Sequence, residues 1–338
     1  MTHLVRLATI EDLQPLYEMA KLTGGGFTNL PADKAALASK LERSAAAATA
    51  ASVDDKDDHL FVLVLEDSAS GEVRGTAQIF TAVGRRSPFY SYRLGTLTQS
   101  SRELNRTFRA DMLTLTTDLE GSSEVGGLFL HPSERAGGLG MLLARSRYLF
   151  IRQHRALFAD RVIAELRGVI DEAGGSPFWD GLAGRFFGMS FQEADAFNAV
   201  HGHQFIADLM PKHPIYIAML PETARAVIGI PHMTGRAAMR MLETEGFQFE
   251  NYVDIFDGGP TMIAATNRIA SIAAAEEATL TAIGAGAGEQ RLVSTGRLAD
   301  FRAAYARIDG SAAGVTIDAD AARLLRVAAG DTVLHAPR

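Results

Sequence analysis

The residues best suited to chemistry in this 338-residue chain form a glycine-rich stretch with the pattern R-x-x-G-x-G, Arg135-Ala136-Gly137-Gly138-Leu139-Gly140. The stretch follows an apolar run at 125–130 and precedes a helical sequence expected from 141 onward. Glycines leave backbone N–H groups accessible, and a helix N-terminus attracts negative charge. The stretch therefore predicts a cradle for a phosphate-bearing ligand. A tight strand-to-helix turn that binds nothing is the alternative.

Three kinds of phosphate loop could account for this pattern. A dinucleotide loop has the spacing G-x-G-x-x-G and follows the first strand of its fold, whereas here about six strands come first. A Walker loop requires Gly-Lys-Ser or Gly-Lys-Thr, which this stretch lacks. The remaining kind is the pyrophosphate loop of an acyl-CoA enzyme.

A histidine far downstream is the first candidate for proton transfer. His232 lies in a loop ahead of an expected helix, and the ordinary pKa of histidine, near 6.5, suits acid–base work at neutral pH. His213 is the rival, but it lies between Pro211 and Pro214, where a structural turn is expected. The alternative for either residue is an ordinary surface histidine.

The elements that must position these residues follow from hydrophobic patterning and turn residues. We expect a βαβ unit made of a strand at 125–130, the glycine-rich loop, a helix over 141–158 and a strand over 161–171. The two strands of such a unit should be parallel. The other strands are expected to form an antiparallel sheet, at 3–8, 59–66, 73–83, 92–98, 112–117 and 246–256. Further helices are expected at 9–22, 33–48, 177–210, 222–228 and 235–245.

A four-residue break, Asp257-Gly258-Gly259-Pro260, is the best domain boundary in the chain. Beyond it the sequence becomes rich in alanine and carries short β-like runs. We therefore expect an α/β domain over 1–260 and a small β-rich, barrel-like domain over 261–338.

Composition excludes several classes of protein. A net charge of −7 argues against a nucleic-acid binder, and we expect no membrane-spanning segment. The chain has no cysteine, so it has neither disulfides nor a cysteine nucleophile, and no metal site is predicted. The N-terminal sequence lacks the form of a signal peptide, so we expect a cytoplasmic protein.

Several longer motifs carry a family resemblance. They are TGGG at 23–26 with LPA at 30–32, YRLGTL at 92–97, GSSE at 121–124, LFL at 128–130, RGVIDE at 167–172, SPFW at 176–179, LMPKHPIY at 209–216 and DIFDGGP at 254–260. With these motifs the chain resembles the arginine/ornithine N-succinyltransferase family of the GNAT-like acyltransferase superfamily. The resemblance covers most of the first 260 residues, and the tail after 261 matches only loosely.

The resemblance implies a GNAT-like fold, a mixed and mostly antiparallel sheet flanked by helices. It implies succinyl-CoA as co-substrate, with no permanently bound cofactor, and L-arginine or ornithine as acceptor. By resemblance, His232 is the proton donor and Leu128 contacts succinyl-CoA through its backbone. The pyrophosphate would then bind at Arg135, Gly137, Gly138, Leu139 and Gly140. The chain departs from its relatives at Met233, where a proline is common.

Selectivity for such substrates needs a carboxylate for the guanidinium and a cation for the succinyl carboxylate. The candidates are Glu124, Glu165, Asp171, Glu172 and Asp254 for the first role, and Arg93, Arg167 and Lys212 for the second. The loop 24–26 lies where such enzymes line the acceptor pocket, although a packing turn explains it equally well.

Two other functions stay open. One is an acetyl-CoA-dependent N-acetyltransferase acting on another amine. The other is a non-catalytic subunit of a heteromeric succinyltransferase. The resemblance implies a homo-oligomer or a heteromer with a paralogous subunit.

Overall fold

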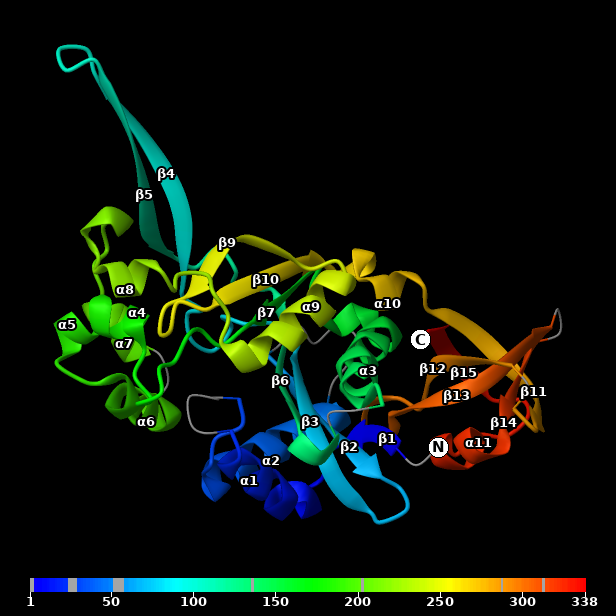
Figure 1. Cartoon of the computed structure of the whole chain (residues 1–338). Helices are drawn as coiled ribbons and strands as arrows, with labels where there is room; N and C mark the ends of the chain where they lie inside the picture. The colour runs from blue at the N-terminus through cyan, green and yellow to red at the C-terminus, as the bar shows by residue number, and fades with distance from the viewer. Residues whose placement is uncertain are drawn as a thin grey trace.

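A single long sheet organises the molecule (Figure 1). The computed structural model describes residues 3–23, 29–50, 58–134, 137–201, 204–286, 288–311 and 314–338. The strands are β1 (His3–Leu7), β2 (Leu60–Asp67), β3 (Glu72–Phe80), β4 (Ser91–Ser101), β5 (Arg106–Thr116), β6 (Ser123–Leu130), β7 (Arg161–Glu165), β8 (Ile215–Tyr216), β9 (Gln248–Asp254), β10 (Pro260–Ala265), β11 (Glu276–Gly284), β12 (Glu289–Thr295), β13 (Arg302–Ser311), β14 (Gly314–Asp318) and β15 (Thr332–Pro337).

The helices cover the sheet on both faces and form a separate cluster beside β4 and β5 (Figure 1). They are α1 (Leu13–Lys21), α2 (Lys34–Ala50), α3 (Leu139–Gln153), α4 (Pro177–Gly181), α5 (Gly184–Phe187), α6 (Phe191–His201), α7 (Gln204–Leu209), α8 (Glu222–Arg225), α9 (Arg236–Thr244), α10 (Ala270–Ala273) and α11 (Ala319–Leu325). No helix in the described ranges is long and apolar enough to cross a membrane.

The strand order explains the mixed fold class. The N-terminal part runs β1-β2-β3-β6-β7-β10-β9-β4-β5-β8, and all its neighbours are antiparallel except β6 and β7. The C-terminal part runs β12-β15-β11-β14-β13, and a further pairing of β12 with β13 closes these five strands into a barrel. The prediction of a mostly antiparallel mixed sheet with a barrel-like C-terminal region is confirmed.

Strand β2 shows why the middle of the sheet is apolar on both faces. Phe61 and Leu63 belong to the core that includes α3, whereas Val62 and Val64 belong to the core that includes α1 and α2. Successive side chains point to opposite faces, so a strand covered on both sides reads as a continuous apolar run. The core around α3 also includes barrel residues such as Phe301.

Three predicted elements have different bounds in the structure. The helical stretch expected over 177–210 is divided into α4, α5, α6 and α7, and Gly188, with φ +63°, ends α5. The strand expected over 161–171 ends at Glu165. Beyond it, Gly168 forms only an isolated bridge with Pro231. The helix expected from 141 begins at Leu139.

The predicted domain boundary lies between β9 and β10. β10 pairs with both β7 and β9, so 260–265 extends the N-terminal sheet and takes no part in the barrel. The division of the chain at 260 stays a prediction. The pairing of β10 with β7 and β9 fits a boundary after α10 better than one at 260.

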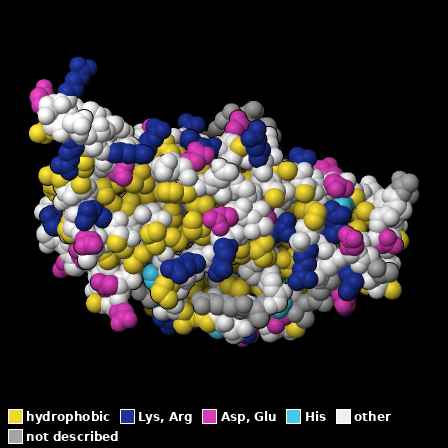
Figure 2. All heavy atoms as spheres, turned by 45° about the horizontal axis from the view of Figure 1, so that its top comes forward, with side chains coloured by type: hydrophobic (Ala, Val, Ile, Leu, Met, Phe, Trp, Pro, Cys, Tyr) yellow, Lys and Arg dark blue, Asp and Glu magenta, His cyan; other side chains and the backbone are white. Residues whose placement is uncertain are grey.

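The β4–β5 hairpin projects from the body of the molecule (Figures 1 and 2). Its outer half is exposed, including the large apolar side chains of Leu97, Leu104 and Phe108. Figure 2 shows basic side chains toward the tip of this projection, where Arg102, Arg106 and Arg109 belong to the hairpin sequence.

Candidate active site

Strands β6 and β7 are parallel, as predicted, but they pair only near their start. Ser123 lies opposite Val162 and Glu124 opposite Ile163, while β6 continues to Leu130. Past Glu124, the β7 side of β6 has no strand partner within the described ranges. Backbone groups on that side of β6 can therefore bind a ligand.

A β-bulge at Gly127 changes the direction of β6 inside this unpaired segment. Thr76 of β3 lies opposite Phe129 and Gln78 lies opposite Gly126, so β6 carries an extra residue. Gly127 has φ +57°, and a Cβ there would come within 2.9 Å of the Gln78 side chain. Both the conformation and the space require glycine at this position.

Leu128 follows the bulge directly. Its side chain is half-buried and packs against the core that includes α3. Packing by the side chain leaves the main chain of Leu128 available to a ligand. Its contact with succinyl-CoA stays a prediction.

The predicted phosphate loop ends in two glycines in the left-handed region. Gly137 has φ +71° and Gly138 has φ +82°, both are exposed, and Gly138 is the N-cap of α3. Leu139 and Gly140 form the first turn of this 15-residue helix. Arg135 and Ala136 lie outside the described residues.

A cation from the barrel lies beside this loop. A Cβ at Gly138 would be 3.1 Å from Nη2 of Arg338. The Arg338 guanidinium stacks on Tyr305, 4.8 Å from the ring centre, and the Tyr305 hydroxyl donates to the Gly138 carbonyl at 3.4 Å. The barrel therefore adds positive charge next to the N-terminus of α3.

His232 lies against the chain that leaves β7. Its backbone N–H donates to the Arg167 carbonyl at 2.7 Å. Its Nδ1 lies 2.8 Å from the Thr234 hydroxyl and accepts the Thr234 N–H at 3.3 Å, so Nε2 is the ring nitrogen left for a reactant. Burial, together with the positive charge of Arg167, lowers the pKa of His232.

Three carboxyl groups lie close enough for their charges to interact: Glu124 at the start of β6, Glu165 at the end of β7 and Asp257 after β9. Burial raises the pKa of Glu124 to about 7 and that of Asp257 to about 7, and it raises the pKa of Glu165 well above its usual value. The negative charge of Asp254 adds to all three shifts. Carboxyl groups with such raised pKa values are concentrated at functional sites.

A polar network holds one side of the bulge. The carbonyl of Asn29 accepts from Lys40 Nζ at 3.0 Å and from Gln78 Nε2 at 2.6 Å, and the Asn29 side chain bonds to Glu124. A Cβ at Gly126 would meet the Asn29 amide at 2.8 Å. Burial lowers the pKa of Lys40 to about 8. The network thus fixes Asn29 directly over the bulged strand.

Two family models match the chain almost from end to end. The model described as "Arginine N-succinyltransferase beta subunit" matches residues 3–271, and the model of its C-terminal domain matches residues 276–337. The chain belongs to the arginine N-succinyltransferase family.

Individual members of the arginine N-succinyltransferase family agree with this assignment. An arginine N-succinyltransferase of Citrobacter koseri is 42% identical over 97% of this chain and 96% of its own length. An arginine N-succinyltransferase of Salmonella paratyphi B is 43% identical over 95% of this chain and 94% of its own length. The solved structure of arginine/ornithine succinyltransferase subunit AI from Pseudomonas aeruginosa is 34% identical, covers 99% of this chain and 98% of its own, and has a TM-score of 0.91.

Four of the eight charges predicted to read the substrates have structural partners. Asp171 accepts the N–H groups of Ala173 and Gly175, and Asp254 accepts those of Phe256 and Asp257. Lys212 donates to the Ala207 carbonyl, and Arg93 lies 3.6 Å from Asp118. Of the other four, Glu124 lies in β6, Glu165 ends β7 and Arg167 follows it, whereas Glu172 is exposed in the loop before α4. The loop 24–26 lies outside the described residues, and the described chain resumes at Asn29.

Sequence reasoning missed the supporting residues. Lys40 and Arg338 look like ordinary surface cations, and their role depends on contacts across long stretches of chain. Gln78 offered one usable signal, because a glutamine within the apolar run 73–83 is a polar group expected to be buried. The described residues include no group of three His, Asp or Glu side chains placed to hold a metal.

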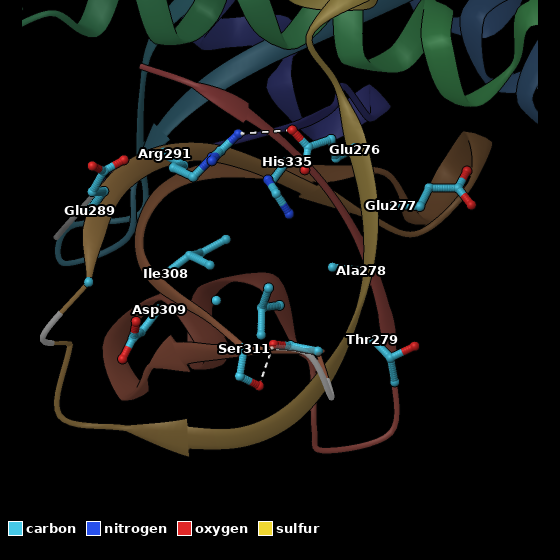
Figure 3. Close-up of a pocket in the computed structure, with 14 residues that line it drawn as sticks. Glu276, Glu277, Ala278, Thr279, Glu289, Arg291, Ile308, Asp309, Ser311 and His335 are labelled. Carbon is cyan, nitrogen blue, oxygen red and sulfur yellow. Dashed lines mark hydrogen bonds and ion pairs between the residues drawn. The ribbon is translucent and has the colours of Figure 1, made fainter.

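A cavity of about 860 Å³ opens in the barrel, away from these residues (Figure 3). His335 points into it, and Arg291 lies at its edge, 3.9 Å from Glu276. No residue predicted for the active site lines this cavity.

Proposed function

We propose that this chain transfers the succinyl group of succinyl-CoA to the α-amine of L-arginine, giving N2-succinyl-L-arginine and CoA. The observation that carries the proposal is the end of pairing between the parallel strands β6 and β7. Leu128 follows the bulge in the part of β6 that β7 leaves unpaired, and the chain that leaves β7 accepts the backbone N–H of His232. The choice of substrates is supported by the 42–43% sequence identity with arginine N-succinyltransferases over nearly the whole chain.

The reaction is a direct attack in a ternary complex. The neutral α-amine attacks the thioester carbon, a C–N bond forms, the C–S bond breaks and the CoA thiolate leaves. Because the chain has no cysteine, a thioester intermediate on the protein is excluded. The carbonyl oxygen gains negative charge during attack, and a backbone N–H at Leu128 stabilises that charge.

Proton transfer is the role of His232. Both contacts of its ring involve Nδ1, so Nε2 is the atom that exchanges a proton with the reactants. The departing thiolate takes up the Nε2 proton, and the proton that the amine releases returns to Nε2 or passes to Glu124, a carboxyl group of β6 whose pKa burial raises to about 7.

The CoA pyrophosphate binds at the glycine-rich loop. Gly137 and Gly138 expose their backbone, and the N-terminus of α3 contributes the positive end of its dipole. Arg135 is the predicted cation of the loop, and Arg338 is a second cation beside it.

Release of CoA from succinyl-CoA is the direct test. The purified protein is mixed with succinyl-CoA or acetyl-CoA and with L-arginine or L-ornithine, free thiol is measured, and the acylated product is identified by mass. We expect the highest turnover with succinyl-CoA and L-arginine. Absence of thiol release with both amino acids would contradict the proposal, and a preference for acetyl-CoA would favour the acetyltransferase alternative.

We also propose that the chain works as an oligomer. The Pseudomonas relative is described as a subunit, and the exposed β4–β5 hairpin carries apolar side chains typical of an interaction surface. Light scattering of the purified protein measures its mass directly. A monomer at micromolar concentration with full activity would contradict this part of the proposal.

A further inference from the structure

A row of polar side chains crosses one face of the N-terminal sheet. Thr261 of β10 lies opposite Glu165 of β7, and Ser91 of β4 lies opposite Asp254 of β9. Directly paired residues share a face, and so do residues two apart on one strand. Thr261 also lies opposite Tyr252, two residues before Asp254, so both pairs are on one face.

The row begins at β6. Glu124 lies opposite Ile163, two residues before Glu165, which places Glu124 on the same face. The opposite face carries Ala164 and Val162, which pack in the core with α3. The row therefore starts beside the bulge and the proposed thioester site, and it runs away from them across β7 and β10.

Three atoms of this row are buried without a hydrogen-bond partner in the part of the chain that the structure describes. They are Oε1 of Glu165, Oγ1 of Thr261 and Oγ of Ser91. Thr261 is 0% exposed and Ser91 is 1% exposed. Buried polar groups are nearly always hydrogen-bonded, so a group of neighbouring exceptions points to a missing partner.

The charge around Glu165 indicates what kind of partner is missing. Asp254, Glu124 and Asp257 all act on it with negative charge, and no ion pair of Glu165 with Lys or Arg occurs among the described residues. Asp257 differs, because both its oxygens accept backbone N–H groups, from Gly168 and Gly259. Glu165 is thus the carboxylate of this cluster that lacks a donor.

We propose that Glu165 and Thr261 bind the guanidinium group of the acceptor amino acid. The inference rests on the proposed function, because that function places the reacting amine beside β6. A guanidinium carries five N–H donors in one plane, which suits a carboxylate and a neighbouring hydroxyl oxygen. It would supply both the positive charge and the donors that this part of the sheet lacks.

The position of Glu165 and the length of arginine fit this assignment. Pairing of β7 with β6 ends at Ile163, so Glu165, two residues further on, lies beside the unpaired part of β6, and Thr261 of β10 lies opposite Glu165. An extended arginine measures about 7 Å from its α-amine to its guanidinium carbon, since it spans six bonds of about 1.5 Å. One arginine molecule is therefore long enough to extend from an amine beside the unpaired part of β6 to a guanidinium at Glu165 and Thr261.

L-Citrulline gives a sharp test, because it replaces only the guanidinium of arginine with a neutral ureido group. We expect Glu165→Gln to lower kcat/KM for L-arginine by about 10- to 100-fold, mainly through KM, and to change kcat/KM for L-citrulline little. The KM for succinyl-CoA should stay the same. Glu66→Gln is the matched control, because Glu66 of β2 pairs with Arg6 of β1, away from the row, and its loss should leave the arginine-to-citrulline ratio unchanged.

The outcomes separate this inference from the proposed function. An arginine-to-citrulline ratio that is the same in the wild type and in Glu165→Gln overturns the inference while the proposed function stands. If the wild type forms no succinylarginine, the proposed function fails, and calorimetric titration with L-arginine alone still tests the site. Binding that is equal in the wild type and in Glu165→Gln then overturns the inference. Thr261→Val provides the second variant if Glu165→Gln does not fold, with the same loss of arginine selectivity expected.

Discussion

Arg167 tunes the ring of His232 through its charge. The carbonyl of Arg167 holds the His232 backbone, and its positive charge helps lower the His232 pKa. Replacing Arg167 by glutamine removes that charge and raises the His232 pKa. The limb of the pH–rate profile governed by His232 should therefore move to higher pH. Arg167→Lys keeps the charge, so its profile should match the wild type. Identical profiles for all three proteins would contradict this coupling.

His232 itself is tested by removal. In His232→Ala we expect kcat to fall by about 10²–10⁴-fold, because proton transfer to the leaving thiolate is lost. CoA affinity should not change, since the ring lies at the exit of β7 and not at the glycine-rich loop. Turnover measured under saturating succinyl-CoA, together with a CoA titration, checks both statements. Unchanged turnover would remove His232 from the mechanism.

At the scale of the strand, the bulge in β6 depends on one glycine. Gly127→Ala puts a Cβ 2.9 Å from Gln78 and forces an alanine to φ +57°. We expect a loss of about 1–3 kcal/mol in the free energy of unfolding, and kcat should fall as the main chain at Leu128 shifts. Gly95→Ala is the control, because that strand glycine has nothing within 4 Å of the added Cβ. Equal stability and activity of the two variants would show that the bulge geometry is unimportant.

At the scale of the helix, the N-terminus of α3 is predicted to hold phosphate. Gly138→Asp places a negative charge there in a left-handed conformation that aspartate tolerates. The Kd for CoA should rise about tenfold or more, which corresponds to roughly 1.4 kcal/mol. Gly71→Asp adds the same charge at another exposed glycine with positive φ, where nothing lies within 4 Å, and should leave the Kd unchanged. Unaltered CoA binding in Gly138→Asp would refute the phosphate site.

For the whole molecule, the buried carboxyl groups predict an unusual dependence of stability on pH. Glu124 and Asp257 have pKa values of about 7 in the folded protein, against ordinary values of 4.5 and 3.8. Between these values the folded state holds protons that the unfolded chain has released, so stability rises as the pH falls. From about pH 8 to about pH 6.5 the free energy of unfolding should increase by roughly 1 kcal/mol.

Urea denaturation at the two pH values measures this difference. Below about pH 6.5, His154 opposes this gain in stability. Burial lowers its pKa in the folded protein to about 4, so between about pH 6.5 and pH 4 the unfolded chain binds a proton that the folded protein does not. In Glu165→Gln the free energy of unfolding should change less with pH above about pH 6.5, since the substitution removes one carboxyl group whose pKa burial raises. A free energy of unfolding that is equal or lower at the lower pH would contradict this account.

Local patterns in the sequence predicted the parts of the site that are local. The apolar run of β6, the glycines and the start of α3 are neighbours in the chain, so periodicity and turn residues locate them to within two residues. The contact of His232 with Arg167 and the pairing of Thr261 with Glu165 join distant segments. Their register depends on how the whole sheet packs, which no local pattern specifies. The same limit applies to β10, because its pairing with β7 and β9 joins distant segments of the chain.

Strand β1 joins the beginning of the chain to its end. It lies between β2 and β13, with Val5 opposite Leu65 on one side and opposite Ala303 on the other. During synthesis β2 can pair with β1 early, but the β13 edge of β1 stays open until almost three hundred further residues have left the ribosome. An open strand edge invites pairing with other chains. The nascent protein therefore passes through a long stage in which aggregation competes with folding, and chaperones that shield this edge should increase its yield.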